Sequence, residues 1–148
     1  TLARIAAAEG RAFPVVTSAG ALVSELRRAG GRKVALLMPY TDSLAEIVVR
    51  YIANEGIEVA GYKNFSVADN QEVGRIPGSR LLDALKDLPV ESVDAVVLSA
   101  CVQMPSLDVL QEARRLTGKP VTSTAECTSF AMLRALGLAA PQSHEVAA

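Results

Sequence analysis

Cysteine, histidine and tryptophan are scarce in this chain of 148 residues, which has two cysteines, one histidine and no tryptophan. The cysteines form no Cys-x-x-Cys pair and no cluster with histidine, which argues against a disulfide framework and against a zinc site. We therefore expect a reducing, cytoplasmic location. The one histidine, His144, lies in a polar terminal tail, where disorder is the usual state, so we assign it no function.

The chain also lacks an excess of charge of one sign and any long apolar run. Lysine and arginine total 15 and aspartate and glutamate total 16, so there is no basic field for nucleic acid. No uninterrupted apolar stretch reaches the length that spans a bilayer. Half of the residues are apolar, which is enough to build one core of ordinary size. We expect a compact soluble domain that binds neither nucleic acid nor membrane.

Apolar, β-rich runs alternate with helix-period stretches along the chain, which is typical of βαβ units and a mainly parallel sheet. Strands are predicted at 14–18, 33–38, 57–65, 95–99 and 120–123. Helices are predicted at 19–29, 44–54, 79–88, 107–116 and 124–136. Ser43-x-x-Glu46 has the pattern of a capping box, and Ser79 that of an N-cap. The fold class is therefore α/β, a flavodoxin-like three-layer arrangement around a parallel sheet.

The segment that begins at Pro14 is similar to the one that begins at Pro120. Each has a Pro-Val-rich strand pattern, then Thr and Ser, then a helix ending in a Leu-Arg pair and glycine. This echo indicates that the end of one α/β half recurs at the end of a second, although two such strands also resemble each other by chance. We expect 1–31 to be the last helix, strand and helix of a truncated first half, 32–138 the second half, and 139–148 a flexible tail.

Cys101 follows the predicted strand at 95–99, and a helix follows it after Pro105. In an open parallel sheet, ligands bind outside the carboxyl ends of the strands. The N-H groups at the start of the next helix favour anions there, and they favour thiolate over thiol. Since unreactive cysteines are common in cores, position alone leaves Cys101 open between catalysis and packing. Cys127, on the last predicted helix, is expected to be a small packing residue.

Other residues just after the strands carry hydroxyl or amide groups. They are Thr17, Ser18, Tyr40, Thr41, Asn70, Ser99, Ser123 and Thr124. Lys, Arg and His are absent from this rim, so helix N-terminal N-H groups and neutral donors would hold an anion, which suits small carboxylates. No Gly-rich phosphate loop is present, so we expect no nucleotide cofactor and cofactor-free chemistry.

Each of these residues also has a structural interpretation. The Tyr40 ring would cap the sheet, and Ser99 would point inward. Asp69-x-x-Glu72 has the pattern of a capping box, which would make Asn70 only a residue at the start of a helix. For Asn70 the structural interpretation is the favoured one on this evidence alone.

Four motifs stand in a distinctive order along the chain. They are Thr-Ser-Ala-Gly-Ala-Leu at 17–22, Pro-Tyr at 39–40 after a Val-Ala-Leu-Leu-Met strand, Val-Ala-Asp-Asn at 67–70, and Ser-Ala-Cys-Val-Gln-Met-Pro-Ser-Leu at 99–107. Together they resemble the maleate cis-trans isomerases of the aspartate/glutamate racemase superfamily, over nearly all of 10–138. The resemblance implies the second half of a pseudosymmetric two-domain fold, with a cleft that carries one cysteine from each half.

The resemblance also implies roles for individual residues. Cys101 matches the second cysteine, which protonates a substrate adduct, and Tyr40 and Asn70 match residues that bind the substrate carboxylates. Thr41, Ser18 and the backbone N-H groups from Val102 onward would complete the binding site. The first cysteine of the family, its nucleophile, lies in a Tyr-Ala-Cys-Leu type segment that these 148 residues do not contain.

The implied function is cofactor-independent isomerisation of maleate to fumarate, with a small dicarboxylate as the partner and no turnover by this chain alone. We also expect a homo-oligomer. Amino-acid racemases tend to carry Cys-Thr-Glu or Cys-Thr-His, and arylmalonate decarboxylases Cys-Gly-Gly, whereas residues 101–104 read Cys-Val-Gln-Met. An Asp/Glu-type racemase, an arylmalonate decarboxylase-like enzyme and a non-catalytic small-ligand-binding domain with an inert Cys101 stay open as alternatives.

Overall fold

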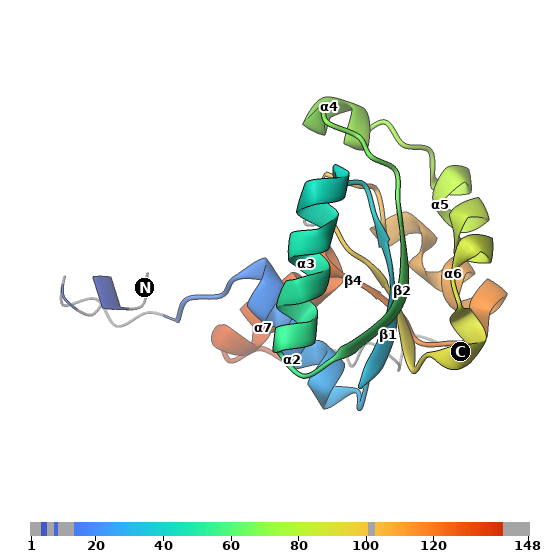
Figure 1. Cartoon of the computed structure of the whole chain (residues 1–148). Helices are drawn as coiled ribbons and strands as arrows, with labels where there is room; N and C mark the ends of the chain where they lie inside the picture. Colours follow the sequence, from blue (N-terminus) through green and yellow to red (C-terminus); the bar gives the residue numbers. More distant parts are fainter. Residues whose placement is uncertain (1–3, 6–7, 9–13, 101–102, 141–148) are drawn as a thin grey trace.

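The computed structural model of the protein describes residues 4–5, 8, 14–100 and 103–140, and it contains a parallel sheet covered by helices on both faces (Figure 1). The strands are β1 (Lys33–Met38), β2 (Glu58–Asn64), β3 (Ala95–Leu98) and β4 (Val121–Ser123). They are hydrogen-bonded in the order β2-β1-β3-β4, and each neighbouring pair is parallel. This order matches the first four strands of a flavodoxin-like sheet, so the predicted α/β class is confirmed.

Helices connect the strands. They are α2 (Ser18–Arg28), α3 (Asp42–Asn54), α4 (Asn70–Val73), α5 (Gly78–Ala84), α6 (Leu110–Thr117) and α7 (Thr124–Ala135), with short 3-10 turns η1 (Leu85–Asp87), η2 (Val90–Ser92) and η3 (Leu107–Val109). Figure 1 shows α2, α3 and α7 on one face of the sheet and α5 and α6 on the other. The chain therefore forms three layers, as the sequence predicted.

Alternate residues of the central strand β1 enter two separate cores. Val34, Leu36 and Met38 pack with α2, α3 and α7, whereas Ala35 and Leu37 pack with α5, η1 and α6. All five side chains are fully buried. A strand covered on both faces is expected to read as a continuous apolar run, as the Val-Ala-Leu-Leu-Met sequence does.

Most element boundaries agree with the sequence prediction, and two of the differences are 3-10 turns at helix ends. The helix predicted at 79–88 ends as the 3-10 turn η1, and the one predicted at 107–116 begins as the 3-10 turn η3. Such turns are common at helix ends. Arg4, Ile5 and Ala8, described residues from the helix expected at the beginning of 1–31, are helical.

The strand predicted at 14–18 is wrong. Residues 14–17 have no regular structure, and Ser18 is already the first residue of α2. Pro120 precedes a true strand because β4 pairs with β3, with Val121 opposite Val96. No such partner lies beside residues 14–17 within the described part of the chain, and an apolar run becomes a strand only when it pairs.

Two predicted helix starts are also wrong. Helix α3 begins at Asp42 with Thr41 as its N-cap, so Ser43 lies inside the first turn and the expected capping box does not form. Helix α5 begins at Gly78, ahead of the expected cap Ser79. A Cβ atom at Gly78 would lie 2.7 Å from a methyl group of Val109, so any other residue at this helix start would force Val109 or the helix to shift.

Candidate active site at the carboxyl edge of the sheet

The strand order has its switch point between β1 and β3. From β1 the chain turns outward to β2 on one side, whereas β3 and β4 lie on the other side. At this switch point the loops that follow β1 and β3 diverge, and ligands of open α/β sheets bind there. The loop after β1 carries Tyr40 and Thr41, and the loop after β3 carries residues 99–106. The sheet order thus brings together the loops that carry the Pro-Tyr motif at 39–40 and the motif at 99–107.

Tyr40 lies at the junction of the two cores. Its half-buried side chain packs against the apolar residues of both faces, and its carbonyl oxygen accepts a hydrogen bond from Asn64 Nδ2 at 3.2 Å. Thr41 caps α3 with its carbonyl, which accepts from the N-H of Ala45 at 2.9 Å, while its hydroxyl makes no capping bond. The Tyr40 side chain therefore packs on the apolar core, as expected if its ring caps the sheet.

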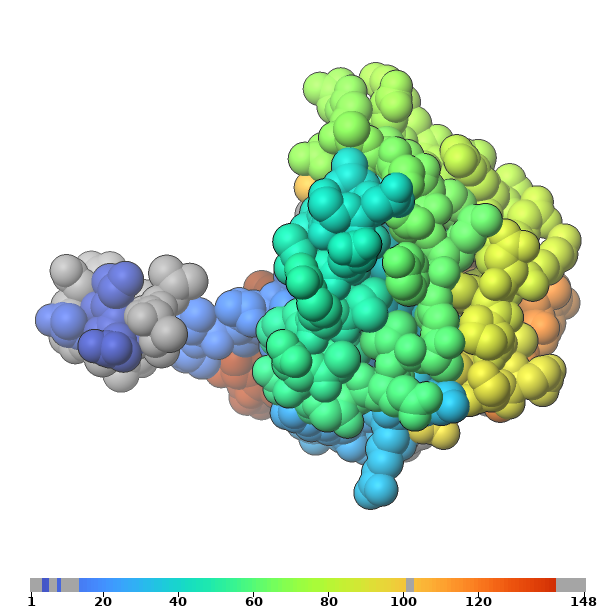
Figure 2. All heavy atoms as spheres, in the orientation of Figure 1, coloured from blue at the N-terminus to red at the C-terminus, as the bar shows by residue number. Residues whose placement is uncertain are grey.

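Asn70 is the first residue of α4, at the carboxyl end of β2. The N-cap is Asp69, whose Oδ1 accepts from the N-H of Gln71 at 2.8 Å. The predicted helix start is confirmed, but this bond is not the one to Glu72 that a capping box requires. The Asn70 side chain is exposed. The space-filling view shows the α4 region standing beyond the start of α3 (Figure 2). Asn70 is thus a helix-start residue, and its amide is not used for capping.

The loop after β3 is anchored on both sides of the candidate catalytic residue. Ser99 and Ala100 are buried before it, and Met104 and Ser106 are buried after it. Cys101 and Val102 themselves lie outside the described residues, so their predicted roles stay predictions. The prediction that Ser99 points inward agrees with its burial.

Helix α7 begins at the end of β4, at the same edge. Ser123 caps it by accepting from the N-H of Glu126 at 3.0 Å. Thr124, its first residue, is buried, and its hydroxyl has no hydrogen-bond partner, as is also true of Ser106 in the β3–α6 loop. Because α2 ends next to the start of β1, its first residue, Ser18, also lies toward this edge.

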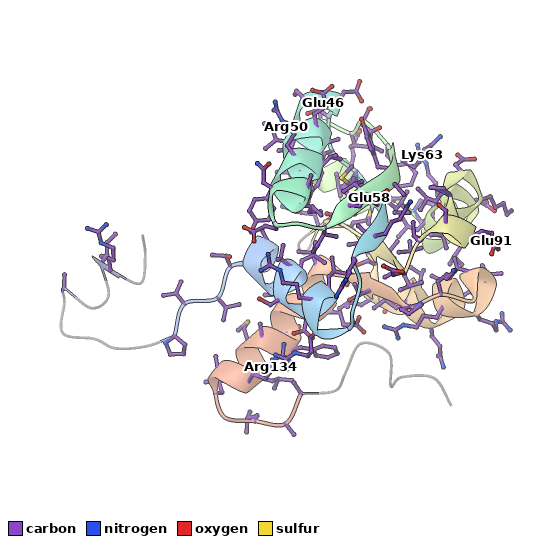
Figure 3. The ribbon with its side chains drawn as sticks, turned by 60° about the horizontal axis from the view of Figure 1, so that its bottom comes forward. Glu46, Arg50, Glu58, Lys63, Glu91 and Arg134 are labelled. Atoms are coloured by element: carbon purple, nitrogen blue, oxygen red, sulfur yellow. The ribbon has the colours of Figure 1, made fainter. Side chains whose placement is uncertain are left out.

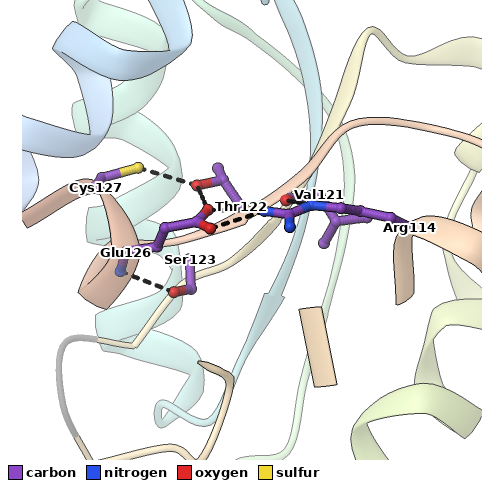
Figure 4. A network of polar contacts seen from close by, with 6 residues as sticks. All are labelled: Arg114, Val121, Thr122, Ser123, Glu126 and Cys127. Atoms are coloured by element: carbon purple, nitrogen blue, oxygen red, sulfur yellow. Dashed lines mark hydrogen bonds and ion pairs between the residues drawn. The ribbon is translucent and has the colours of Figure 1, made fainter. Parts of the chain in front are cut away.

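A buried polar network lies behind the start of α7 (Figure 4). The carboxylate of Glu126 accepts two hydrogen bonds from Arg114 Nη2, at 2.8 and 3.0 Å, and a third from the Thr122 hydroxyl at 2.8 Å. Arg114 Nε donates to the Val121 carbonyl at 2.9 Å. Sequence analysis missed this network, because Arg114 and Glu126 lie on different helices and only the tertiary fold brings them together.

Cys127 contacts the same network but is no candidate for catalysis. Its sulfur lies 3.2 Å from the Thr122 hydroxyl, and the residue is fully buried. Burial is the largest cause that raises the pKa of this thiol, to about 12, and the nearby Glu126 carboxylate adds to the effect. The predicted packing role of Cys127 is confirmed.

Charged side chains and a small apolar pocket lie outside the candidate site. Both signs are interspersed over the surface, with Glu46 and Arg50 on α3 and Glu58 and Lys63 on β2 (Figure 3). The guanidinium carbon of Arg80 lies 4.8 Å from the centre of the Phe65 ring. One cation therefore lies near the loop that follows β2, although none follows a strand directly.

A small apolar pocket between α2, β3 and β4 lies at the amino ends of the strands, opposite the candidate site.

Within the described ranges, no group of three or more His, Cys, Asp or Glu residues is placed to hold a metal ion. No helix in those same ranges is both long enough and apolar enough to cross a membrane.

The sheet order and the site at its switch point define an α/β protein of the flavodoxin-like class. Residues 2–146 match the family model described as arylmalonate decarboxylase, and the chain belongs to that family. Maleate isomerases of Geobacillus stearothermophilus and Alcaligenes faecalis are 45% and 48% identical to it over 137 and 129 residues, which are 93% and 87% of this chain. Those segments are 55% and 51% of the relatives, so the chain spans about half of their length.

Solved structures of maleate isomerases have the same fold. One, from Pseudomonas putida S16, was determined with maleate, and it matches with a TM-score of 0.88 and 41% identity over 93% of this chain and 55% of that chain. Another, a Nocardia farcinica maleate cis-trans isomerase mutant with a covalently bound succinylcysteine intermediate, matches with a TM-score of 0.88 and 43% identity over 93% of this chain and 56% of that chain. The resemblance noted in the sequence is therefore confirmed as homology.

Proposed function

We propose that the protein catalyses the cofactor-independent isomerisation of maleate to fumarate, and that this chain supplies one side of the active site. The observation that carries the proposal is the identity of 45% and 48% to two maleate isomerases over most of the chain. A related enzyme held as a succinylcysteine adduct supports a mechanism through a cysteine thiolate.

The chemistry of the carboxyl edge fits a small dicarboxylate. Tyr40 and the exposed amide of Asn70 are neutral hydrogen-bond donors. The N-H groups at the start of α7 and those of the loop from Val102 onward add dipoles that attract anions. Thr41 and Ser18 add hydroxyl groups at the same edge. We propose that these groups hold the two carboxylates while the bond between the central carbons rotates.

Rotation requires the carbon-carbon double bond to become single for a time. In the proposed mechanism a cysteine thiolate adds to one alkene carbon, and the π electrons move to the neighbouring carbon, next to its carboxylate. Cys101 gives its thiol proton to that carbon, which yields a succinyl thioether. After rotation the Cys101 thiolate removes a proton from the same carbon, the carbon-sulfur bond breaks, and fumarate leaves.

The nucleophile of this mechanism must be a cysteine other than Cys101. Cys127 does not fit the role, because it is buried behind β4 and its pKa is raised to about 12. The 148 residues contain no third cysteine. We propose that a segment outside these residues supplies the nucleophilic thiolate, and that this chain alone does not turn over maleate.

The test is a comparison of two cysteine variants in the complete natural protein. Cys101→Ala is expected to lower the rate of fumarate formation by roughly 100- to 10,000-fold, the usual contribution of a general acid-base group. Cys127→Ala, the matched control, should keep a rate near that of the wild type. Fumarate formation at the wild-type rate by the Cys101→Ala protein would refute the assigned role of Cys101.

The alternatives within the superfamily are separated by substrate. Exchange of the α-proton of aspartate or glutamate with deuterium would indicate a racemase, and release of carbon dioxide from an arylmalonate would indicate a decarboxylase. Neither reaction is expected here.

The assembly into a homo-oligomer and the cytoplasmic location of the protein stay predictions.

A further inference from the structure

Ser66 has an unusual backbone conformation at the carboxyl edge of the sheet. It follows the end of β2, and among the described residues it is the one non-glycine residue with a positive φ, 53°. Residues with a side chain rarely adopt this region, and they stay in it only where surrounding contacts fix the chain. The contacts on either side of Ser66 provide that constraint.

The segment 64–67 binds the backbone of the loop that follows β1. The N-H of Phe65 donates to the Met38 carbonyl at 2.9 Å, and the N-H of Val67 donates to the Pro39 carbonyl, also at 2.9 Å. The left-handed residue lies between these two donors. Its conformation lets the chain turn so that both donors face the same neighbouring loop.

The next carbonyl of that loop, at Tyr40, is held by a side chain. Asn64 Nδ2 lies 3.2 Å from the Tyr40 carbonyl oxygen, 2.7 Å from Asp42 Oδ1 and 3.1 Å from Ser66 Oγ. Ser66 Oγ donates in turn to Asp42 Oδ1 at 2.8 Å. Asp42, Asn64 and Ser66 thus form a closed set of hydrogen bonds, which we call the Asn64 clamp.

The charge of Asp42 suits this arrangement. Hydrogen bonds from Asn64, and then from Ser66, lower the pKa of the Asp42 carboxyl, so at neutral pH it is an ionised acceptor for both. An amide NH2 group is the donor that this position requires, because it serves the Tyr40 carbonyl and the Asp42 carboxylate together.

The Asn64 clamp contacts one of the two residues to which the proposed function assigns the substrate carboxylates, and it precedes the other in the chain. Tyr40 is held by it directly, and Asn70 follows Ser66 after a short loop. These two residues are on loops that leave different strands, β1 and β2, so their spacing depends on contacts between the loops. The clamp and the two backbone hydrogen bonds beside it provide such contacts.

We infer that Asn64 is a positioning residue of the substrate site, which acts through Asp42 and Ser66 to fix the Tyr40 loop against the Asn70 loop and so sets the spacing of the two carboxylate-binding groups. The inference rests on the proposed function. Displacing a binding group by about 1 Å can cost roughly 100-fold in rate, so a residue that touches no substrate can still control its binding.

The test is Asn64→Asp in the complete natural protein. A carboxylate at position 64 accepts but does not donate, and it repels Asp42. We expect the KM for maleate to rise about tenfold or more at pH 8, with a smaller change in kcat. As the pH falls toward 5, one carboxyl of the pair takes up a proton and can donate again, so the ratio of variant to wild-type KM should fall. A ratio near one at pH 8, or one that does not change with pH, would overturn the inference.

Two substitutions of Ser66 separate its hydroxyl from its backbone. Both Ser66→Ala and Ser66→Gly remove the hydroxyl, but glycine accepts a positive φ without strain. We expect both variants to raise the KM for maleate, with Ser66→Gly melting at the higher temperature. Ser79→Ala, an exposed hydroxyl on α5, is the matched control and should keep the wild-type KM. A wild-type KM in Ser66→Gly would contradict the role of the hydroxyl.

Amide hydrogen exchange separates this inference from the proposed function. Peptides that cover 65–70 should exchange faster in Asn64→Asp than in the wild type, because the clamp no longer holds the loop. If the wild-type protein did not convert maleate, the proposed function would be refuted, but the hydrogen-exchange comparison would still test the clamp. Unchanged exchange would overturn the clamp whatever the activity.

Discussion

At the scale of single residues, burial makes Cys127 an unreactive thiol. Cys127 and Cys101 are both cysteines in β-α segments, but Cys127 is enclosed by α2, α3 and the sheet. Its pKa, raised from 9.0 to about 12 mainly by burial, keeps it a neutral thiol. Thiolate is the reactive form, so the fold removes Cys127 from thiol chemistry at neutral pH.

Thiol labelling checks this difference. With iodoacetamide at pH 7.5, Cys127 should stay unlabelled in the native protein and react once the protein is unfolded in urea. Cys101 should react faster, because it is proposed to be an activated site thiol. Peptide mass spectrometry after a short pulse gives both rates, and Cys127→Ala identifies the signal of Cys101. Equal slow labelling of the two cysteines would favour the non-catalytic binding domain.

Local sequence pattern predicts some single-residue roles correctly, although it misplaces the helix caps at Ser43 and Ser79. Cys127 was assigned to packing, and Asp69 to a helix start, from their neighbours alone. Asn64 and Ser66 gave no comparable signal, because an asparagine and a serine at a strand end are ordinary. Their roles come from Asp42 and Tyr40, which lie on another element.

At the scale of elements, α2 and α7 begin in the same way. Thr17 and Ser123 hold corresponding positions in the two similar segments, and each hydroxyl accepts from the backbone N-H three residues on, at 3.2 and 3.0 Å. The two helices pack against each other, and Glu25 of α2 forms an ion pair with Arg134 of α7. The two similar segments thus begin their helices with equivalent caps, although only α7 is preceded by a strand.

The two caps differ in burial, which gives a prediction. Ser123→Ala should lower the free energy of unfolding by about 1 to 2 kcal/mol, and Thr17→Ala by about 0.5 to 1 kcal/mol, the usual range for loss of an N-cap. The larger effect belongs to Ser123, because it is fully buried and water cannot replace its bond to the Glu126 N-H, whereas Thr17 is exposed. Urea denaturation of both variants measures the difference. A larger loss for Thr17→Ala would contradict this account.

At the scale of the whole molecule, one ion pair joins the two layers of helices. Arg114 on α6 and Glu126 on α7 belong to helices on opposite faces, and they meet beside the edge strand β4 (Figure 4). Their side chains are only 11% and 10% exposed, so each charge depends on the other. The pair connects the two cores at the end of the sheet where no further strand lies within the described residues.

Removing one charge should therefore cost more than removing both. Arg114→Met leaves the Glu126 carboxylate buried without its partner, and we expect a loss of about 3 to 5 kcal/mol in the free energy of unfolding. The double variant Arg114→Met, Glu126→Gln should be more stable than this single variant, because no buried charge remains. A double-mutant cycle by urea denaturation tests the coupling. If Arg114→Met were as stable as the wild type, the pair would have no role in joining the layers.

The sequence by itself determined the α/β class, the course of β1, the helices that follow the strands, and the segments that carry the proposed site. The class and the elements depend on periodicity and turn residues within about ten neighbouring positions, whereas the site segments were indicated by short motifs that resemble the maleate isomerases. Only the tertiary structure decided that residues 14–17 form no strand, that Asn64 holds the Tyr40 loop, and that Arg114 meets Glu126. Each of these depends on a partner far away in the chain, and pairing across such distances leaves no local pattern.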